Sequence, residues 1–272
     1  MSTQEIGQLI DSVNNLTQTV AGKVEEIDNK VEEATGAVPD TIKEHMNVTV
    51  YVDAVSGHDG NTGKSQSAAL KTIAAAIESA PSNSVVSVVL KNGQTHVVSE
   101  RIQCLNKIIM FTPWFYNSNH PEIRVASFLE NGALTCGTFD SPREINLYYV
   151  DLNMDDCVDT ETPWHGYARG LIRNGDKPIQ VQFAMAQGNL SYAGHPVMHS
   201  AGRTSLVSAS FYNVTLEKRP SIRAEQKVFE CFGGSMFLMG TSFVNSSHVD
   251  LIGVVKDQFG SVMNLNSNYD YS

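Results

Sequence analysis

Hydrophobic residues in the first forty positions recur at helical spacing. Alternating steps of three and four residues separate them, which is the spacing of a coiled-coil seam. One additional step of four lies between Val20 and Val24, and such a stutter locally unwinds a left-handed supercoil. The seam consists of Ile6, Leu9, Val13, Leu16, Val20, Val24, Ile27 and Val31.

The narrowness of this stripe decides between two interpretations. Every other face of the helix is polar, which favours a coiled coil over a single amphipathic helix lying on the following domain. We expect a coiled coil over residues 1–39, roughly 50 Å long at about 1.5 Å per residue, that ends at Gly36 and Pro39. Residues 40–47 would form a short linker. The β-branched residues at most seam positions favour a coiled coil of more than two helices.

The hydrophobic period changes in residues 48–80. Valines alternate with Thr49 and Tyr51, which predicts a half-buried strand. A loop at 57–63 follows, rich in residues that tolerate a positive φ. Apolar residues then return to helical spacing over 70–77, and Pro81 stops this second helix.

Short strands are predicted throughout the rest of the chain. Residues 85–90 are almost continuously apolar, which is typical of a strand buried on both faces. Few helices could fit between the candidates. The further strand candidates are 95–99, 102–105, 108–112, 123–128, 133–139, 145–154, 179–185, 206–216, 236–244 and 262–265.

A sequence repeat indicates how these strands are arranged. Residues 234–243 align with 260–269, an offset of about 26 residues, which is in the range of solenoid repeats. Residues 211–216 align one repeat earlier, 185–190 align loosely one repeat before that, and 147–152 match 211–216 in residue type. The repeat predicts stacked coils of a parallel solenoid. The alternative, a β-sandwich, needs more hairpin turn pairs than the sequence contains.

Composition narrows the classes of function. With 42% hydrophobic residues the chain can build one sizeable core, and a net charge of −10 argues against nucleic acid and anionic membranes as partners. The sequence has no apolar run long enough to indicate membrane insertion, and no signal peptide is recognisable. We therefore expect synthesis in a cytoplasm. The four cysteines are irregularly spaced, which predicts buried thiols rather than a zinc site. Neither a metal nor another cofactor is expected. His195 and His199 are four residues apart and could bind one metal ion from a helix, but Pro196 between them disfavours a helix there.

An acidic segment is the candidate for catalysis. Two neighbouring carboxylates can divide acid and base roles between them. The alternative is a solvated loop between coils, and the spacing does not show that the side chains converge, so we assign no catalytic residue. The candidates, if the protein is an enzyme, are Asp155, Asp156, Asp159 and Glu161.

Two aromatic segments are candidates for binding a glycan. Exposed aromatic rings stack on the apolar faces of sugars, and polar neighbours bind the hydroxyl groups. The alternative is that these rings fill the core or a subunit interface. The candidates are Trp114, Tyr116, Trp164, His165, Tyr167 and Arg169.

Part of the 48–80 stretch resembles a known family. The segments 51–53, 71–73 and 76–77, with the loop between them, are similar to the opening of right-handed parallel β-helix proteins of the pectate-lyase-like class, many of which are phage tailspikes and tail fibres. In that family the segment caps one end of the β-helix. Ala69-Leu70 stands where the family usually has Pro-Phe.

The resemblance implies an all-β, right-handed parallel β-helix over 48–272, preceded by a trimeric coiled coil. A homotrimeric phage tail fibre for host-cell attachment is then expected, made in the bacterial cytoplasm and carried in the virion tail. Its coil would bind other virion proteins and its β-helix a host surface glycan. Two alternatives stay open: a tailspike depolymerase acting as a polysaccharide hydrolase or lyase, and a head fibre or adaptor with a purely structural role.

Overall fold

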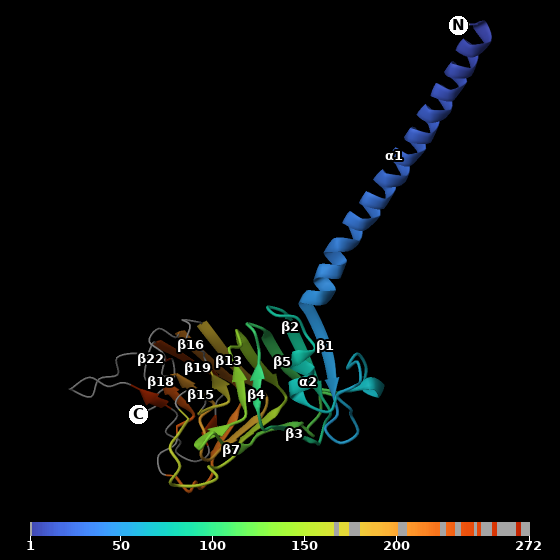
Figure 1. The fold of residues 1–272 in the computed structure, drawn as a ribbon. Helices are drawn as coiled ribbons and strands as arrows, with labels where there is room; N and C mark the ends of the chain where they lie inside the picture. The colour runs from blue at the N-terminus through green and yellow to red at the C-terminus, as the bar shows by residue number, and fades with distance from the viewer. Residues whose placement is uncertain are drawn as a thin grey trace. The chain divides into compact units, whose positions relative to one another are not determined.

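The computed structural model describes residues 2–165, 169–173, 180–200, 206–223, 227–231, 235–241, 244–245, 252–254 and 265–267. The chain divides into two compact units, Met1–Met46 and Asn47–Ser272. The first unit is helical and the second is mostly β-structure with few helices (Figure 1).

The first unit is one long helix, α1 (Thr3–Met46). Its 44 residues correspond to about 66 Å at 1.5 Å per residue. Ser2 and Glu5 cap its first turn reciprocally, because the Glu5 N–H donates to Ser2 Oγ and the Ser2 N–H to Glu5 Oε2. All eight predicted seam residues are exposed in the single chain, by between 46% and 64%.

The predicted end of this helix is wrong. Helical backbone continues through Gly36 and Pro39 to Met46, and β1 begins at the next residue, so no linker occupies 40–47. Proline within a helix costs about 3 kcal/mol because it removes one hydrogen bond and crowds the preceding turn.

The second unit contains three parallel sheets, which we call A, B and C. Sheet A has eight strands and sheets B and C have six each. In sheet A the strands are β1 (Asn47–Val52), β2 (Val85–Leu90), β5 (Ile108–Pro113), β10 (Glu144–Tyr148), β13 (Gln180–Ala186), β16 (Leu206–Tyr212), β19 (Ser235–Thr241) and β22 (Leu265–Ser267).

Sheet B and sheet C are built in the same way from shorter strands. Sheet B contains β3 (Thr95–Val98), β6 (Glu122–Val125), β11 (Asp151–Met154), β14 (Asn189–Tyr192), β17 (Thr215–Lys218) and β20 (Val244–Asn245). Sheet C contains β4 (Arg101–Gln103), β9 (Thr138–Asp140), β12 (Ile172–Arg173), β15 (Met198–Ser200), β18 (Phe229–Cys231) and β21 (Ile252–Val254). From β2 onward the chain visits A, B and C in turn, a solenoid-like order.

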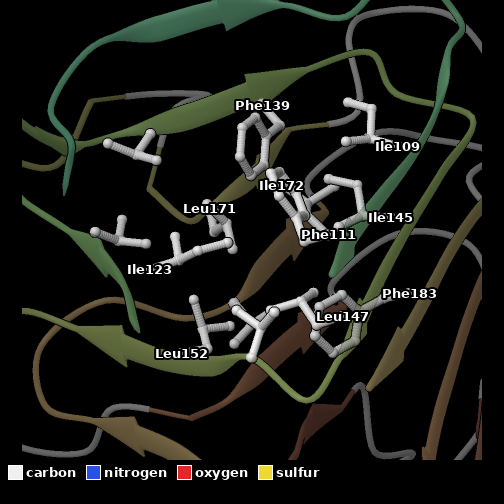
Figure 2. Close-up of a cluster of buried hydrophobic side chains, with 14 of the residues drawn as sticks. Ile109, Phe111, Ile123, Phe139, Ile145, Leu147, Leu152, Leu171, Ile172 and Phe183 are labelled. Atoms are coloured by element: carbon white, nitrogen blue, oxygen red, sulfur yellow. The ribbon is translucent and has the colours of Figure 1, made fainter. Parts of the chain in front are cut away.

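One continuous core lies between the three sheets. Figure 2 shows side chains from all of them meeting there: Phe111 and Leu147 from sheet A, Ile123 from sheet B, and Phe139 and Ile172 from sheet C. Each of these side chains is essentially fully buried. Burying one such side chain contributes about 1.5–3 kcal/mol, so the stacked ladders stabilise the unit.

The strand–loop–helix expectation for residues 48–80 is confirmed. After β1 and its loop, which contains the short 3-10 helix η1 (Gln66–Ala68), α2 (Ile73–Glu78) contacts β1, β2, β3 and β4. Thr72 caps α2 by accepting the Ala75 N–H at 3.1 Å. Asp59 holds the entry to the helix, since its Oδ1 accepts the N–H groups of Lys71 and Thr72.

The predicted repeat is correct in part. Leu147 pairs with Met185 and Met185 with Phe211, as the alignment of these segments predicts. Spacing between coils nevertheless varies: stacked positions are 23 residues apart at Asn92 and Phe115, 38 apart at Asp151 and Asn189, and 26 apart at Gln187 and Asn213. The longer coils carry loops outside the sheets.

The last two alignments are wrong in register. Met236 pairs with Leu265 rather than with Val262, which lies outside the described residues, and Phe211 pairs with Gly240 rather than Leu238. Residue types alone could not fix the register, because apolar residues occupy both alternating sets of positions in β19.

Several predicted strands are divided in the structure. The 145–154 candidate becomes β10 and β11, and 206–216 becomes β16 and β17, because Tyr149 and Asn213 have positive φ values of 56° and 51° and turn the chain. The candidates 123–128, 133–139 and 236–244 are each divided too. No strand was predicted at β12, β14, β15, β18 or β21, which have two to four residues each.

The expectation that 85–90 is buried on both faces is also wrong. Val86, Val88 and Leu90 point into the core with no exposed surface, whereas Val85, Ser87 and Val89 on the opposite face are half-buried. In the described residues, one face of this strand packs into the core, and the other face is apolar or small but only half-buried.

Candidate functional site

A hairpin and a long loop form a lobe where the chain passes from sheet B to sheet C. The hairpin pairs β7 (Ser127–Glu130) with β8 (Ala133–Cys136) in antiparallel fashion. The loop is residues 155–171, of which 166–168 lie outside the described residues. Backbone bonds join them: the Leu134 N–H donates to Pro163 O and the His165 N–H to Leu134 O, both at 2.8 Å. We call these segments the corner lobe.

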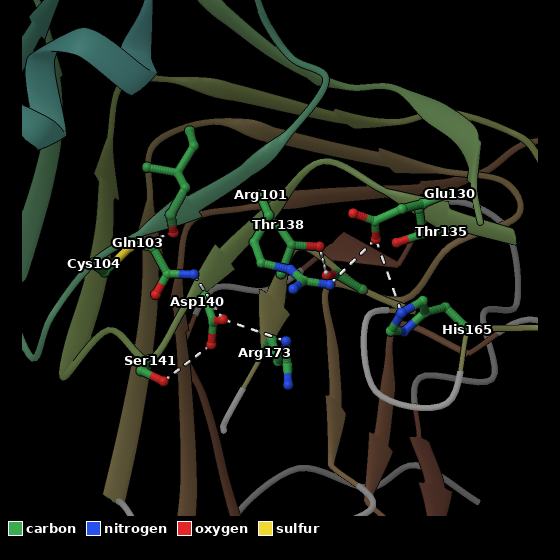
Figure 3. Close-up of polar contacts among 12 residues, drawn as sticks. Arg101, Gln103, Cys104, Glu130, Thr135, Thr138, Asp140, Ser141, His165 and Arg173 are labelled. Atoms are coloured by element: carbon green, nitrogen blue, oxygen red, sulfur yellow. Dashed lines mark hydrogen bonds and ion pairs between the residues drawn. The ribbon is translucent and has the colours of Figure 1, made fainter. Parts of the chain in front are cut away.

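Charged side chains connect the hairpin to sheet C and to the loop (Figure 3). Glu130 Oε2 accepts a hydrogen bond from Arg101 at 3.3 Å and lies 3.9 Å from His165 Nε2. Farther along sheet C, Asp140 Oδ2 accepts from both Gln103 and Arg173. These ion pairs link neighbouring coils.

His195 is a buried side chain that joins two segments of the corner lobe. Its Nδ1 lies 2.9 Å from Arg169 O and its Nε2 lies 2.8 Å from Ser127 Oγ, so it connects the loop to the hairpin. Its ring meets Trp164 edge to face at 5.2 Å. Burial lowers the pKa of His195 below its ordinary value, which keeps the imidazole neutral.

Trp164 and its neighbours are occupied by contacts within the chain. The Trp164 ring has the guanidinium groups of Arg223 at 5.0 Å and Arg169 at 5.9 Å, in addition to His195. Arg169 also donates to His165 O. Of the predicted glycan-binding residues, Trp164, His165 and Arg169 therefore support the corner lobe, and Tyr167 lies outside the described residues.

The first two acidic candidates are held by separate partners. Asp155 accepts two bonds from Arg124 Nε, at 2.9 and 3.1 Å, across neighbouring strands of sheet B. Asp156 accepts the N–H of Cys157 and the hydroxyl of Ser221 on Oδ1, and the N–H of Ile222 on Oδ2. Asp155 thus pairs with a cation, whereas Asp156 fastens one coil to another.

The other two acidic candidates shape the loop itself. Asp159 Oδ1 accepts the N–H groups of Glu161 and Thr162 and a bond from Arg223 at 3.3 Å. Hydrogen bonds from Thr162 lower the pKa of Asp159, whereas a general acid needs a raised pKa. Glu161 is exposed, and its Oε1 lies 3.3 Å from Thr160 Oγ1. The structure shows these carboxylates as anchors of the corner lobe.

A different aromatic cluster lies where the chain passes from sheet A to sheet B. Trp114 begins it but is itself supported: its Nε1 donates to Val89 O, Tyr51 meets it edge to face at 6.1 Å, and Lys91 Nζ lies 5.3 Å above its ring. Trp114 therefore anchors the loop that follows.

Four further rings make up this cluster, and we call them the aromatic ridge: Phe115, Tyr116, His120 and Tyr149. Phe115 is 58% exposed and Tyr116 is 67% exposed. Tyr149, on the next coil, meets Tyr116 at 5.2 Å and His120 at 5.8 Å, both edge to face. His120 Nδ1 lies 3.3 Å from Asp151 Oδ1, which also accepts the N–H of Asn189.

Asn92 fixes the loop that carries the ridge. Its Oδ1 accepts the Phe115 N–H, and its Nδ2 donates to Phe115 O and Asn119 O, all at 2.8–2.9 Å. Asn119 lies against Gly93, where a Cβ atom would come within 2.6 Å of the Asn119 amide. The rings are thus displayed on a loop that is already ordered.

Tyr149 has an unusual backbone for its residue type. Its φ is +56°, in the left-handed region, and Gln187 and Asn213 at the same turn of the next two coils have φ of +59° and +51°. This conformation costs about 1–2 kcal/mol for residues with a Cβ atom, and asparagine tolerates it best. The turn is a repeated feature, and Tyr149 places a ring on it.

The aromatic segment that contains Trp114 and Tyr116 is a predicted glycan-binding candidate, whereas its neighbours His120 and Tyr149 are not predicted. Tyr149 comes from another coil, and its position depends on a turn that divides a predicted strand. The hairpin of the corner lobe was also missed, although Asn131-Gly132, with φ values of +51° and +75°, is a typical hairpin turn pair.

The cysteines agree with the prediction of buried thiols. Cys104, Cys136 and Cys157 are free and buried, and the burial of Cys231 lies outside the description. Burial raises the pKa of Cys104 to about 12 and that of Cys157 to about 11, so neither is a reactive thiolate. In the described ranges, no three His, Cys, Asp or Glu side chains are grouped so that they could hold a metal ion.

Comparisons of the chain with protein-family models, curated proteins and solved structures found no match. As far as the chain is described, none of its helices is both long and apolar enough to span a membrane.

Proposed function

We propose that the chain is a homotrimeric bacteriophage tail fibre that attaches the virion to its host by binding a surface glycan. Its first unit would form a three-stranded coiled coil, and its second unit a right-handed parallel β-helix. The A, B, C order of the strands supports the β-helix, with coils of variable length rather than a constant repeat.

The exposed stripe of α1 supports the coiled coil. A helix of 44 residues that leaves Leu16 and Ile27 more than half exposed has not buried its apolar face within its own unit. Association of three such stripes would remove this surface from water, which is the usual driving force for coiled coils. The coil would also join the fibre to other virion proteins, after synthesis in the bacterial host.

The aromatic ridge is the observation that carries glycan binding. Tyr116 and Phe115 present exposed rings, and His120 and Asp151 place polar groups on the same ridge, beside Tyr149. Rings with nearby hydrogen-bonding groups suit the alternating apolar and hydroxyl surfaces of sugars. Because the loop is ordered before binding, less conformational entropy is lost on association. Three ridges in a trimer would add avidity.

The experiment is a binding and cleavage assay on the purified protein. Sedimentation would first establish the trimer, and the protein would then be applied to an array of bacterial capsule and lipopolysaccharide O-antigen oligosaccharides. We expect binding by the native chain and loss of it on Tyr116→Ala. A monomer in sedimentation, or no binding to any array member or to bacterial cells, would contradict the proposal.

The same assay separates the alternatives. New reducing ends or unsaturated uronates, abolished by Asp155→Asn but not by Glu161→Gln, would indicate a depolymerase. A trimer that neither binds nor cleaves would indicate a purely structural fibre or adaptor.

A further inference from the structure

The outer face of sheet A differs in chemistry from the outer faces of sheets B and C. Across four of its strands the described outward positions are uncharged, and most are apolar or small. We call this set the outer A face: Val85, Ser87 and Val89 of β2, Ile108, Met110 and Thr112 of β5, Gln182, Ala184 and Ala186 of β13, and Ser208, Ser210 and Tyr212 of β16.

The strand between them, β10, does not interrupt this character. Its outward carboxylate, Glu144, accepts a hydrogen bond from Asn146 at 2.9 Å, and Asn146 is only 5% exposed. The polar groups of β10 thus satisfy one another within the sheet. Tyr148 ends the strand with a partly exposed ring.

Sheets B and C are polar on their outer faces. In sheet B, Arg124 pairs with Asp155, and Glu122 accepts from Asn153. In sheet C, Arg173 pairs with Asp140. The outer face of sheet B has the charges and cross-strand bonds of a surface that remains in water, and sheet C has a largely buried ion pair. Among its described outward residues, sheet A has a single charged side chain, Glu144, and this difference needs an explanation.

We propose that the outer A face packs against the same face of two other copies of this chain. The core of a protein–protein interface is depleted of charged residues, as this face is. A sheet of eight strands at about 4.8 Å spacing, with about five residues of 3.3 Å each, has a flat area of roughly 650 Å². Because this face would be divided between two partner copies, each contact would receive roughly half of it, which is below the roughly 800 Å² per partner of a stable interface. The contact would therefore supplement the association of the coiled coil.

The connection to α1 is why the occupant is a further copy of the chain. Helix α1 ends at Met46 and β1, the first strand of sheet A, begins at Asn47, so no residue acts as a spacer. This part of the inference rests on the proposed homotrimer: three helices in a coiled coil lie about 10 Å apart. Three β1 strands would then begin close to one axis, and sheet A is the sheet tied to that axis.

The inference also accounts for the 85–90 segment. Its sequence is that of a strand buried on both faces, but one chain buries only Val86, Val88 and Leu90. Packing between copies would bury Val85 and Val89 as well. The apolar pattern would then belong to the assembly rather than to the single chain.

Cross-linking of single cysteines tests the inference in the full-length trimer. Ser87→Cys and Ser210→Cys place a thiol on the outer A face with a change of one atom. Val97→Cys and Ser191→Cys place one on the outer face of sheet B as matched controls. Cys231→Ser is used as the background for all four, because Cys104, Cys136 and Cys157 are buried.

A short bismaleimide should join chains through Ser87→Cys and Ser210→Cys about a hundredfold faster than through the controls, since neighbouring thiols have an effective concentration near millimolar against micromolar protein. Equal rates at both faces in a sedimenting trimer would overturn the inference while leaving the proposed fibre intact. A monomer in sedimentation would instead remove the proposed function and this inference together. As a second readout, Ser87→Lys should lower the melting temperature of the β-structure, whereas Ser191→Lys should not.

Discussion

Replacing Tyr149 with asparagine should weaken glycan binding without unfolding the protein. Tyr149 contacts both Tyr116 and His120, so its ring joins the two ends of the aromatic ridge. Its backbone is in the left-handed region, where asparagine is better tolerated than tyrosine. The substitution thus removes the ring and keeps the turn.

The two effects on stability should nearly cancel. Relief of the left-handed backbone contributes about 1 kcal/mol. Loss of two edge-to-face ring contacts costs about 0.5–1.5 kcal/mol each. The net change in unfolding free energy is then within about 1–2 kcal/mol, which a folded domain tolerates. A loss of binding could therefore not be attributed to unfolding.

The effect on binding should be larger in the trimer than at a single site. One stacking contact worth about 1 kcal/mol corresponds to about fivefold in affinity. If all three ridges engage one surface, the loss compounds to about a hundredfold. The measurement compares binding of a soluble oligosaccharide with adsorption to an immobilised polysaccharide found by the array.

Gln187→Asn is the matched control, because Gln187 occupies the same left-handed turn on the next coil without an aromatic ring. It should leave binding unchanged. If Tyr149→Asn binds as the native chain does while remaining a folded trimer, the ridge is not the glycan site. If Gln187→Asn weakens binding equally, the turn rather than the ring matters, and the reasoning from the ring is refuted.

Three further outcomes are expected. Phe139→Ala should lower the unfolding free energy by about 3–5 kcal/mol in denaturant titration, because its ring is fully buried, whereas Phe115→Ala should change it by less than about 1 kcal/mol; equal losses would contradict the inside–outside assignment. Stability should be fully present above about pH 6.5 and fall at lower pH, because burial lowers the pKa of His195 and the unfolded chain then binds more protons. His195→Gln should flatten this dependence of stability on pH, and His58→Gln should not. Part of the dependence should remain in His195→Gln, because burial also lowers the pKa of His96. An unchanged pH dependence in His195→Gln would contradict the prediction. Val13→Lys should convert the trimer to monomer in sedimentation, whereas Asp11→Lys, outside the seam, should not; a Val13→Lys trimer would argue against the coiled coil.

Periodicity predicted most of the long strands, because their inward residues repeat every second position. The strands of sheet A from β1 to β19, such as β5 and β13, are five to seven residues long and were predicted. Strands such as β12, with two residues, are too short to show a period. Hydrophobic periodicity therefore predicted most strands of sheet A but few strands of sheet C.

The candidate sites were harder to predict for a different reason. Asp155 and Arg124 meet only because coils of unequal length stack, so no spacing within the acidic segment could reveal their pairing. Tyr149 and Tyr116 also come from different coils. Convergence of side chains from stacked strands depends on the register between successive repeats, which residue patterns predict only where the repeat is regular.

The polar residues of the corner lobe and those of the aromatic ridge have different roles. In the corner lobe, Asp156, Asp159 and His195 direct their hydrogen bonds inward and hold a long loop against the hairpin. At the ridge, Asn92 bonds to backbone groups and leaves the rings of Phe115 and Tyr116 facing water. An exposed ring held by buried or backbone-directed polar groups loses little entropy when it binds. For that reason the ridge, rather than the more highly charged corner lobe, is the better candidate for recognition.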